Sequence, residues 1–367
     1  MSGFSSLPGA VTEGRGVQHF GSPIGEQRAL ASGRAVAPLG DRRVLAVSGP
    51  DRLTWLDSIT SQATAALAPG QSSELLILDP QGRVEHAASV LDDGTTAWLI
   101  VDAGDADALL AWLLRMRFRL AVEPRDVAEY AVVGAAAAEG TGPIPVELVA
   151  VPNGTPLVWR DPWPEVSPGG WAYAAADPHP GAERRWIEAI VPVEALDALA
   201  EQVAAGGLAA AGLVAADALR VAAWRPRWAA EVDERTIPHE VDWLRTAVHL
   251  TKGCYRGQET VAKVHNLGHP PRRLVLLHLD GSDSVLPARG APVLEGDAVV
   301  GAVTSAALHH EEGPIALALV KRSTRADADL VVDAGEVRIA AAQEVIVPAD
   351  AGATASVPRL PRLSRRT

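Results

Sequence analysis

The sequence predicts an α+β fold followed by a small β-barrel. In the N-terminal third, a strand and a helix precede three strands joined by tight turns, and a second helix follows. That order differs from the regular strand–helix alternation of a doubly wound parallel sheet. From residue 273 onward, short Val- and Leu-rich runs alternate with Gly, Pro and Asp turns. Such spacing is typical of a small barrel or sandwich.

The first unit is expected to begin with a strand over residues 43–47. Residues 49–51 then start a helix, because Pro suits the first turn and Asp suits the positive end of the helix dipole. Apolar side chains follow at helical spacing, namely Leu53, Leu56 and Ile59. The three-strand meander is predicted over 74–79, 83–91 and 95–101, with turns at 80–82 and 92–94 and a helix over 105–117.

The rest of the chain contains one segment without a clear pattern and several segments whose patterns predict helices or strands. Residues 135–180 are rich in Ala, Gly, Pro and Trp and show no clear period. Helices are expected over 182–190, 193–204 and 215–223, and barrel strands over 274–279, 299–304, 315–320, 330–332 and 337–340. Residues 1–18 and 351–367 are expected to be flexible tails.

Composition limits the classes of function. The chain has 367 residues, a formal net charge of −12 and no long basic block, which argues against direct binding of nucleic acid. No apolar run approaches the ~20 residues that span a bilayer, and no signal peptide is recognisable at the N-terminus. With one cysteine, no internal disulfide is possible, so a reducing cytoplasm is the expected location.

The single cysteine, Cys254, lies in the octapeptide 252–259, which reads K-G-C-Y-R-G-Q-E. Lys252 and Arg256 flank it, and nearby cations or a helix N-terminus favour the reactive thiolate. A helix is expected to begin near Gly257. The local sequence fits two alternatives, a reactive or ligand-binding thiol and a tight turn that contains a cysteine.

Other roles for this thiol can be limited. An iron–sulfur cluster or a structural zinc held by one chain needs several ligands, so no resident metal site is expected. A Cys–His nucleophile pair stays open, because three histidines lie nearby in sequence: His239, His249 and His265.

A second dense segment lies upstream, where Arg and Trp interleave over 220–228 and polar residues continue to Glu240. Aromatic and guanidinium planes suit a flat heterocycle, and an arginine suits a carboxylate. Arg220 and Trp224 are therefore candidate ligand-binding residues. The alternative is a helix end and its exit loop, with the tryptophans simply packed.

Together these segments resemble the YgfZ-type proteins of the glycine-cleavage T-protein (GcvT) superfamily. The octapeptide is similar to that family's K-G-C-Y-x-G-Q-E signature at every fixed position. Supporting similarity extends over most of the chain. Residues 49–56 resemble the first helix, Gly82-Arg83 the β-hairpin, 236–240 the T-x-P-x-E segment, and the β-rich end the C-terminal barrel.

The resemblance implies a fold and a function. Two interleaved α+β subdomains over 19–268 and a barrel over 269–350 would surround a central, folate-sized cavity. The protein would bind tetrahydrofolate or a derivative and assist the assembly or repair of iron–sulfur proteins, including those that modify tRNA. Its partners would be iron–sulfur proteins or their assembly factors.

The resemblance also implies site residues. Cys254, with Lys252, would carry the chemistry. The remaining expected site residues would hold the folate or shape the thiol loop: Arg220, Trp224, Glu240, Tyr255, Arg256, Gly257 and Gln258.

The chain departs from the aminomethyltransferase branch of this superfamily. After the hairpin glycine that branch carries acids, where this chain has His86 and Ala87. Glu85 is adjacent, but regular strand alternation would point it to the face opposite His86. The acid that meets the pterin in that branch is Ala222 here, and Cys254 stands where that branch has another residue.

Three functions therefore remain as hypotheses. The first is a folate-binding auxiliary factor for iron–sulfur proteins that acts through Cys254. The second is a tetrahydrofolate-dependent, aminomethyltransferase-like C1 transferase, which would need a replacement for the missing acids. The third is a non-catalytic binding module, for which Cys254 would be dispensable.

Overall fold

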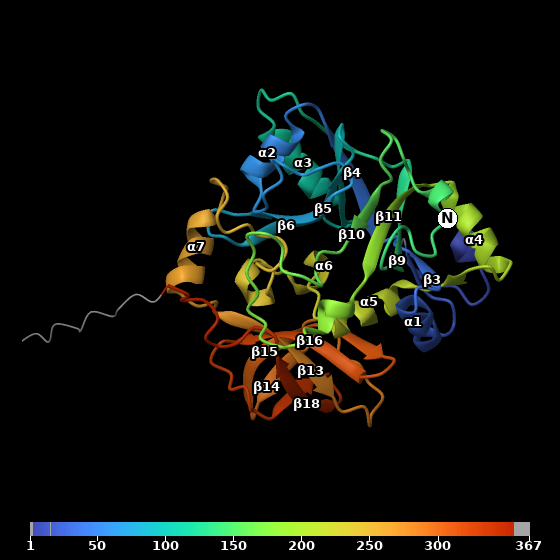
Figure 1. Cartoon of the computed structure of the whole chain (residues 1–367). Helices are drawn as coiled ribbons and strands as arrows, with labels where there is room; N and C mark the ends of the chain where they lie inside the picture. The colour runs from blue at the N-terminus through green and yellow to red at the C-terminus, as the bar shows by residue number, and fades with distance from the viewer. Residues whose placement is uncertain (1–2, 15, 356–367) are drawn as a thin grey trace, which may run out of the picture.

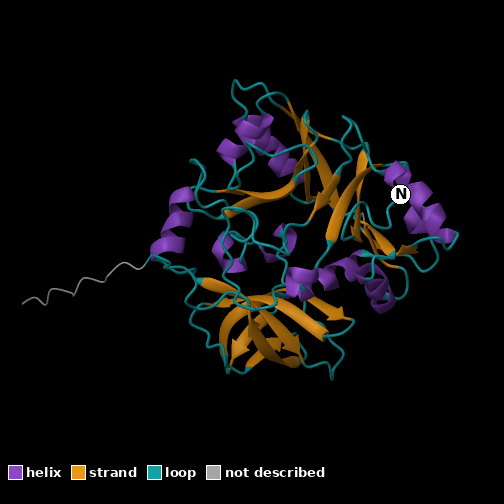
Figure 2. Cartoon of the chain, viewed as in Figure 1, coloured by secondary structure: helices purple, strands orange, loops and turns teal. Residues whose placement is uncertain are grey.

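The computed structural model describes residues 3–14 and 16–355 (Figure 1). Within them the strands form two five-stranded sheets, a two-stranded hairpin and a closed six-stranded barrel (Figure 2). The predicted α+β class with a C-terminal barrel is confirmed. No helix in the described part of the chain is long and apolar enough to cross a membrane.

The first sheet contains the predicted meander. Its order is β5 (Ser72–Leu78), β6 (Val84–Asp92), β7 (Thr96–Asp102), β4 (Arg42–Ser48) and β8 (Glu123–Asp126), with all neighbours antiparallel. Helices α2 (Arg52–Ile59) and α3 (Ala106–Met116) cover one face. Trp55 and Leu113 from these helices pack against buried strand residues such as Leu99. The predicted strand, helix, meander and helix are all present.

The second sheet is assembled from segments far apart in sequence. Its order is β10 (Val158–Arg160), β11 (Trp186–Pro192), β9 (Tyr130–Ala136), β3 (Ala35–Pro38) and β12 (Ala209–Ala210). Helices α1 (Pro23–Ala31), α4 (Ala195–Ala204) and α5 (Leu213–Ala222) pack around it. Strand β3 precedes the whole first sheet in the chain yet pairs with β9, so the two units are interleaved.

The helix predicted over 182–190 is wrong. Residues 180–183 form one 3₁₀ turn, η3 (Pro180–Glu183), and strand β11 follows. Six of the seven residues of β11 are buried, because it lies between β10 and β9. A strand buried on both faces shows no alternation, and a short apolar run of this kind cannot be distinguished from a helix by periodicity.

The described residues among the first 18 also differ from the expected tail. They include a 3₁₀ turn, η1 (Gly3–Ser6), and the hairpin β1 (Val11–Glu13) and β2 (Gly16–His19). Phe4 and Val17 are buried in the core beside Leu199 of α4. At the other end, the predicted tail over 351–367 falls largely outside the described residues, while Ala351 is buried against α7 (Gln258–Leu267) and the barrel.

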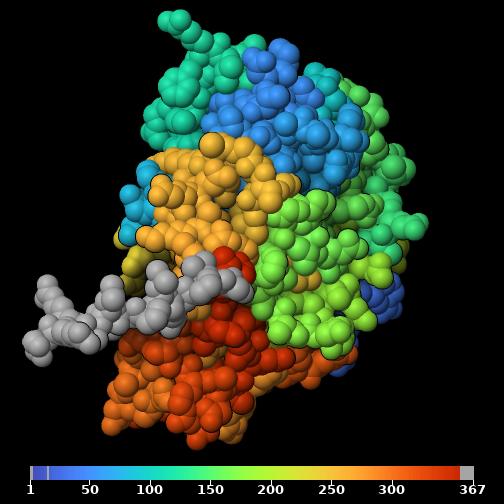
Figure 3. Space-filling model, turned by 60° about the vertical axis from the view of Figure 1, so that its left-hand side comes forward, coloured from blue at the N-terminus to red at the C-terminus, as the bar shows by residue number. Residues whose placement is uncertain are grey.

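The barrel closes in the order β13 (Arg272–Leu279), β16 (Gly313–Lys321), β15 (Ala298–His309), β14 (Pro292–Glu295), β17 (Leu330–Asp333) and β18 (Arg338–Val345). Every predicted barrel strand is present, and β14 is one that the sequence patterns missed. In the space-filling view, the amber surface that contains residues 252–259 lies between the blue first sheet unit and the red barrel (Figure 3).

Asp242 is a fully buried carboxyl group with a raised pKa. Asp242 follows a short 3₁₀ turn, η4 (Pro238–Val241), is fully buried, and has a positive φ of 56°. Its carboxyl accepts a 2.6 Å hydrogen bond from the Tyr173 backbone N–H. Burial raises the pKa of Asp242 from 3.8 to about 7 against the opposing charge of Arg245.

This raised pKa predicts a pH-dependent stability. The native state holds the Asp242 proton more tightly than the unfolded chain, so this contribution falls as pH rises from 3.8 toward 7. Asp242→Asn keeps an acceptor oxygen and tolerates the left-handed backbone. We expect the drop in melting temperature between pH 5 and pH 8 to be smaller in the variant. An unchanged drop, measured by thermal unfolding at both pH values, would contradict this assignment.

Candidate functional site

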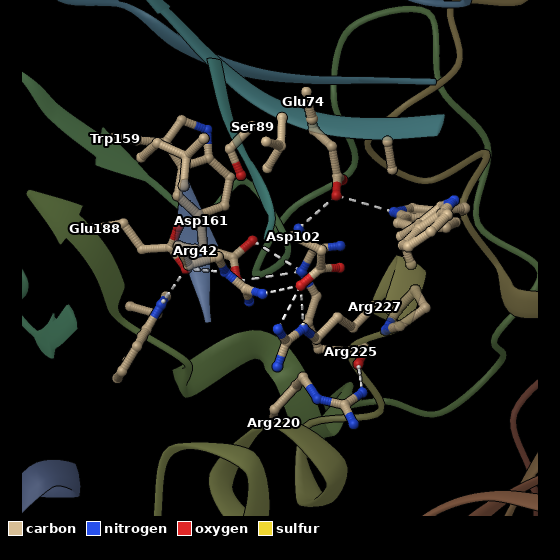
Figure 4. Close-up of a pocket in the computed structure, with 18 of the residues that line it drawn as sticks. Arg42, Glu74, Ser89, Asp102, Trp159, Asp161, Glu188, Arg220, Arg225 and Arg227 are labelled. Atoms are coloured by element: carbon tan, nitrogen blue, oxygen red, sulfur yellow. Dashed lines mark hydrogen bonds and ion pairs between the residues drawn. The ribbon is translucent and has the colours of Figure 1, made fainter. Parts of the chain in front are cut away.

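A cavity of about 70 Å3 lies between the two sheets and the segment that follows α5 (Figure 4). Its lining includes four tryptophans: Trp159, Trp186, Trp228 and Trp243. Each indole N–H donates to a protein oxygen. Because these polar atoms are already paired, the tryptophan rings contribute flat, apolar surface to the cavity wall. This volume is smaller than that of a typical ligand pocket, because charged and aromatic side chains fill much of the space between the sheets.

The same cavity is densely charged. Five arginines and four carboxylates line it: Arg42, Arg184, Arg220, Arg225, Arg227, Glu74, Asp102, Asp161 and Glu188. Buried charges of this kind are tolerated when they are paired and hydrogen-bonded. Most of these groups meet that condition, and the two that do not fully meet it are Arg225 and Glu188.

Asp102, at the end of β7, is the most heavily paired acid. Arg42 and Arg227 both donate to its Oδ1, and the Ala229 backbone N–H donates to its Oδ2 at 3.0 Å. Burial favours the neutral acid, but these two cations outweigh it and lower the pKa of Asp102. Asp102 is therefore an ionised carboxylate that holds two arginines and the start of α6 together.

Arg225 joins the two sheets. Its Nε donates to Asp161 Oδ1 at 3.1 Å, and its Nη2 donates to Glu74 Oε1 at 2.7 Å. The guanidinium lies over the Trp163 ring, 5.1 Å from the centroid. Its Nη1 is buried and has no hydrogen-bond partner among the described residues. This nitrogen is a buried donor that no described residue satisfies.

Glu188, on β11, is the least neutralised acid of the lining. Its Oε1 accepts from Trp186 Nε1 at 3.2 Å, and Arg42 Nε lies 3.8 Å away. Burial raises the pKa of Glu188, and Arg42 opposes that shift only in part. Neither the prediction for 182–190 nor any motif singled out this residue, because its strand was interpreted as a helix.

Arg220, a predicted folate contact, lines the cavity but is saturated by the protein. It donates to Asp217 at 2.6 Å, to Glu231 at 2.9 Å and to Ser305 Oγ at 2.7 Å. It thereby ties α5 to α6 (Trp228–Glu231) and to barrel strand β15. In this structure its guanidinium joins the barrel to the rest of the chain, and its contact with a folate stays a prediction.

Two other predicted folate contacts do not line the cavity. Trp224 is buried in the hydrophobic core, with φ of 59° and its ring in edge contact with His179. Glu240 is fully buried and accepts hydrogen bonds from Arg272 of β13 at 2.8 and 3.0 Å. Glu240 thus fastens the barrel to η4, as Arg220 fastens it to α5.

The octapeptide 252–259 forms an anchored loop. The Lys252 ammonium is buried and donates to the carbonyl oxygens of Asp57, Thr60 and Gln62 at the end of α2. Burial of the ammonium lowers the pKa of Lys252, and the nearby Asp57 carboxylate opposes this shift. These contacts give Lys252 a structural role, and its predicted part in the chemistry stays a prediction.

Two further residues of the octapeptide hold the loop from inside. The Tyr255 ring is buried 5.4 Å from the Lys252 ammonium, and its hydroxyl has no partner among the described residues. Gln258 Nε2 donates to the Lys252 carbonyl at 3.3 Å. The predicted helix after Gly257 is present as α7.

Gly257 is required by a close approach. Its φ is 84°, and a Cβ there would lie 2.6 Å from the Asp79 carbonyl oxygen. A Cβ on Gly82, in the opposing hairpin, would meet Thr260 at 3.0 Å. The two glycines therefore let the β5–β6 turn press against the start of α7. A contact of Gly257 with folate stays a prediction.

Cys254 is exposed and is not among the residues that line the cavity. Arg256, two residues after Cys254, forms an ion pair with Glu85 at 2.6 Å and so connects the octapeptide loop to β6. Of the octapeptide residues predicted as site residues, Cys254 is the one whose side chain has no contact that holds the loop in the described structure. The structure does not bring it together with Arg220.

His86 and Ala87, which stand where the resembled aminomethyltransferase branch has acids, lie in different places in the structure. Ala87 lines the cavity, whereas His86 lies in a separate surface hollow and its Nδ1 is 2.7 Å from Asp105 Oδ1. Ile77 pairs with His86 and Leu78 with Val84, so the residue between them is the extra residue of a β-bulge. The expectation of opposite faces is wrong for this reason: Glu85 lines the same hollow as His86.

Comparison with known proteins fits this geometry. Residues 272–348 match the glycine cleavage T-protein C-terminal barrel domain. The crystal structure of the glycine cleavage system aminomethyltransferase T from Bartonella henselae superposes with a TM-score of 0.70, covering 94% of this chain and 95% of that one at 18% identity. The chain has the glycine-cleavage T-protein fold.

Several aminomethyltransferases are similar to this chain in sequence, at low identity. The aminomethyltransferase of Rippkaea orientalis is 29% identical over 300 residues, 76% of each chain, and that of Symbiobacterium thermophilum is 27% identical over 316 residues, 82% of each. The aminomethyltransferase of Bordetella avium is 26% identical over 238 residues, and this chain spans 60% of its length.

The close approach at Gly257 gives a stability prediction. Gly257→Ala places a Cβ in the left-handed region and against a carbonyl oxygen, and we expect a loss of about 2 kcal/mol or more. Gly253→Ala is the matched control in the same loop, because its Cβ would meet no atom within 4 Å. Thermal unfolding of both variants checks this. Equal melting temperatures for the two would contradict the packing described.

Proposed function

We propose that this protein binds a tetrahydrofolate derivative in its central cavity and acts through the exposed thiol of Cys254. The finer proposal is an auxiliary factor for the assembly or repair of iron–sulfur proteins, including tRNA-modifying ones. One observation carries it. Lys252, Tyr255, Gly257 and Gln258 all serve to hold the octapeptide loop, and the thiol that they frame is exposed.

The lining of the cavity suits a folate by its residue types, and lining side chains would have to move to admit a ligand of that size. Folates combine a flat heterocycle with a carboxylate tail, and the cavity offers tryptophan walls and an excess of one arginine over its carboxylates. The unpartnered Nη1 of Arg225 is a buried donor that a ligand acceptor would satisfy. A reduced folate, when bound, supplies a carrier for a one-carbon unit.

The thiol would work outside the cavity. With one cysteine in the chain, any contact with an iron–sulfur cluster would be transient or shared with a partner chain. Its exposure suits contact with iron–sulfur proteins or their assembly factors. The anchored loop would present the sulfur without reorganisation when a partner docks.

A tetrahydrofolate-dependent, aminomethyltransferase-like C1 transferase is the second candidate. The sequence relatives that bear the name aminomethyltransferase favour it. Against it stands Ala87, which lines the cavity where the transferase branch is expected to place an acid. Ala222 likewise leaves α5 without the acid expected to meet the pterin.

Cys254→Ala tests the thiol. In a strain that lacks this protein, we expect the variant to leave iron–sulfur enzyme activity at the level of the deletion strain. Melting temperature and folate affinity should stay close to those of the unaltered protein, since the side chain is exposed.

Two further variants sharpen this test. Cys254→Ser keeps the shape and should also fail, whereas the neighbouring exposed Thr251→Ala should restore activity. Full rescue by Cys254→Ala would remove the thiol from the mechanism and favour a non-catalytic binding module.

Anaerobic calorimetry with reduced folates tests the cavity. We expect saturable binding and a rise in melting temperature, because a ligand that binds only the native state stabilises it. NAD serves as a control anion with a heterocycle. No heat and no stabilisation at millimolar folate would refute folate binding. An aminomethyl-transfer assay on the same sample separates the two candidates.

A further inference from the structure

The segment at the end of α3 exposes several large apolar side chains. Residues 114–120, the tip, read L-R-M-R-F-R-L and span the end of α3 and the connection to β8. Phe118 is 78% exposed, the largest value among the large apolar side chains of the described residues, and Leu114 and Leu120 are also exposed. Single exposed apolar residues are ordinary on a protein surface, whereas three within seven positions indicate a contact surface.

The same segment carries positive charge that the protein leaves unpaired. Three exposed arginines of the tip form no ion pair with a carboxylate of the described residues: Arg115, Arg117 and Arg119. By contrast, the nearby Arg43 pairs with Asp107 of α3 and Asp126 of β8. The whole chain has a net charge of −12, so the tip is a local exception to the sign of the molecule. It therefore presents cations beside apolar surface.

The base of the tip is fixed to α2. The Trp55 indole donates to the Met116 carbonyl at 3.1 Å, and the Ala121 backbone N–H donates to Asp51 Oδ2 at 2.9 Å. Between these contacts the backbone at Phe118 is left-handed, with φ of 46°. Such a conformation is strained for a residue with a side chain, and it persists where the surroundings hold it in place. The tip is thus presented in one arrangement, which lowers the entropic cost of binding a partner.

The loop that carries Cys254 is fastened to the same helix. The Lys252 ammonium donates at 2.9 Å to the carbonyl of Thr60, just after the end of α2, whereas Asp51 precedes its start. Eight helical residues span about 12 Å, so the tip and the thiol loop are held at the two ends of one short helix. In the space-filling view, the teal region that contains α3 lies on the same face as the amber surface that contains residues 252–259 (Figure 3).

We propose that the tip is the docking surface for the partner protein on which Cys254 acts, and that this partner offers carboxylates around an apolar pocket. Phe118 would enter the pocket, and the three arginines would pair with the carboxylates. The inference rests on the proposed function of the thiol. Aromatic residues and arginine are enriched in protein–protein interfaces. A standard interface takes about 800 Å2 from each partner, which is wide enough to cover both ends of α2.

The number of cations favours a protein over a nucleic acid or a membrane as the occupant. Proteins that bind nucleic acid typically contact roughly 6–10 phosphates, and segments that bind anionic headgroups carry about 4–8 basic residues. The tip has three arginines, on a chain whose net charge of −12 repels a polyanion at long range. A few cations beside an apolar anchor are instead enough to orient an acidic protein surface.

A photo-crosslinking residue tests the docking in living cells. With Phe118→p-benzoylphenylalanine in the full chain, we expect a covalent adduct with a different protein, identified by mass spectrometry. The double reversal Arg117→Glu with Arg119→Glu should reduce this adduct at least about tenfold. The matched control, Arg325→Glu with Arg338→Glu, changes the net charge equally at exposed positions of the barrel domain and should leave the adduct unchanged.

Purified components then test the chemistry of the contact. The captured protein should bind the unaltered chain at least about tenfold more tightly than it binds Phe118→Ser or the double reversal of Arg117 and Arg119. Changing the crosslinked carboxylates of the partner to lysine should restore binding to the double reversal. Melting temperature and folate affinity should stay the same in all these variants of the chain, because the substituted side chains are exposed.

Several results would overturn the docking surface. They are the absence of an adduct, an adduct with nucleic acid or lipid, an adduct with a second copy of this chain, and equal affinity of the captured protein for the double reversal. Rescue in the deletion strain separates the two proposals. If the Phe118→Ser variant restores iron–sulfur enzyme activity fully and Cys254→Ala does not, the docking surface is wrong and the thiol function stands. If Cys254→Ala restores activity and the adduct behaves as expected, the thiol function fails and the docking surface stands.

Discussion

The structure depends on a buried network of arginine–carboxylate pairs that spans the gap between the two sheets. Arg225 is its central member, because it holds Glu74 of β5 and Asp161 of the second unit in one guanidinium. Asp102 collects Arg42 and Arg227 in the same way. Two sheets that met through apolar side chains alone would close this space. Charges that satisfy one another hold the walls apart and keep the space polar.

The barrel is attached by the same chemistry. Arg220 reaches Ser305 of β15, and Glu240 reaches Arg272 of β13. Arg220 was predicted as a folate contact from its place in a dense charged segment, and Glu240 from the family resemblance. In the folded chain they are joints between domains, with their polar atoms taken up by protein partners. A charged residue in a family-like segment can therefore serve the cavity indirectly, by fixing the elements that surround it.

Two separate places now carry the functional interest. The cavity offers a charged lining that includes Arg225, and the surface offers the thiol of Cys254 on a loop anchored by Lys252. Cys254 is not part of the cavity lining, and the Arg256–Glu85 pair links its loop to β6, whose Ala87 lines that cavity. Strand β6 would thus contact both a ligand in the cavity, through Ala87, and the loop that presents the thiol to a partner protein, through Glu85.

The sequence by itself determined the α+β class, the meander and the barrel, because strong turn residues and regular periods act locally. The family resemblance, rather than a local pattern, pointed to acids absent at His86, Ala87 and Ala222, and the role of the octapeptide stays a prediction. Tertiary structure decided the rest. β11 is a strand because two neighbours bury it, Glu85 changes face because of a bulge, and Arg225 keeps a buried nitrogen without a partner among the described residues. Unused hydrogen-bonding capacity is a property of the folded surroundings, and no local pattern encodes it.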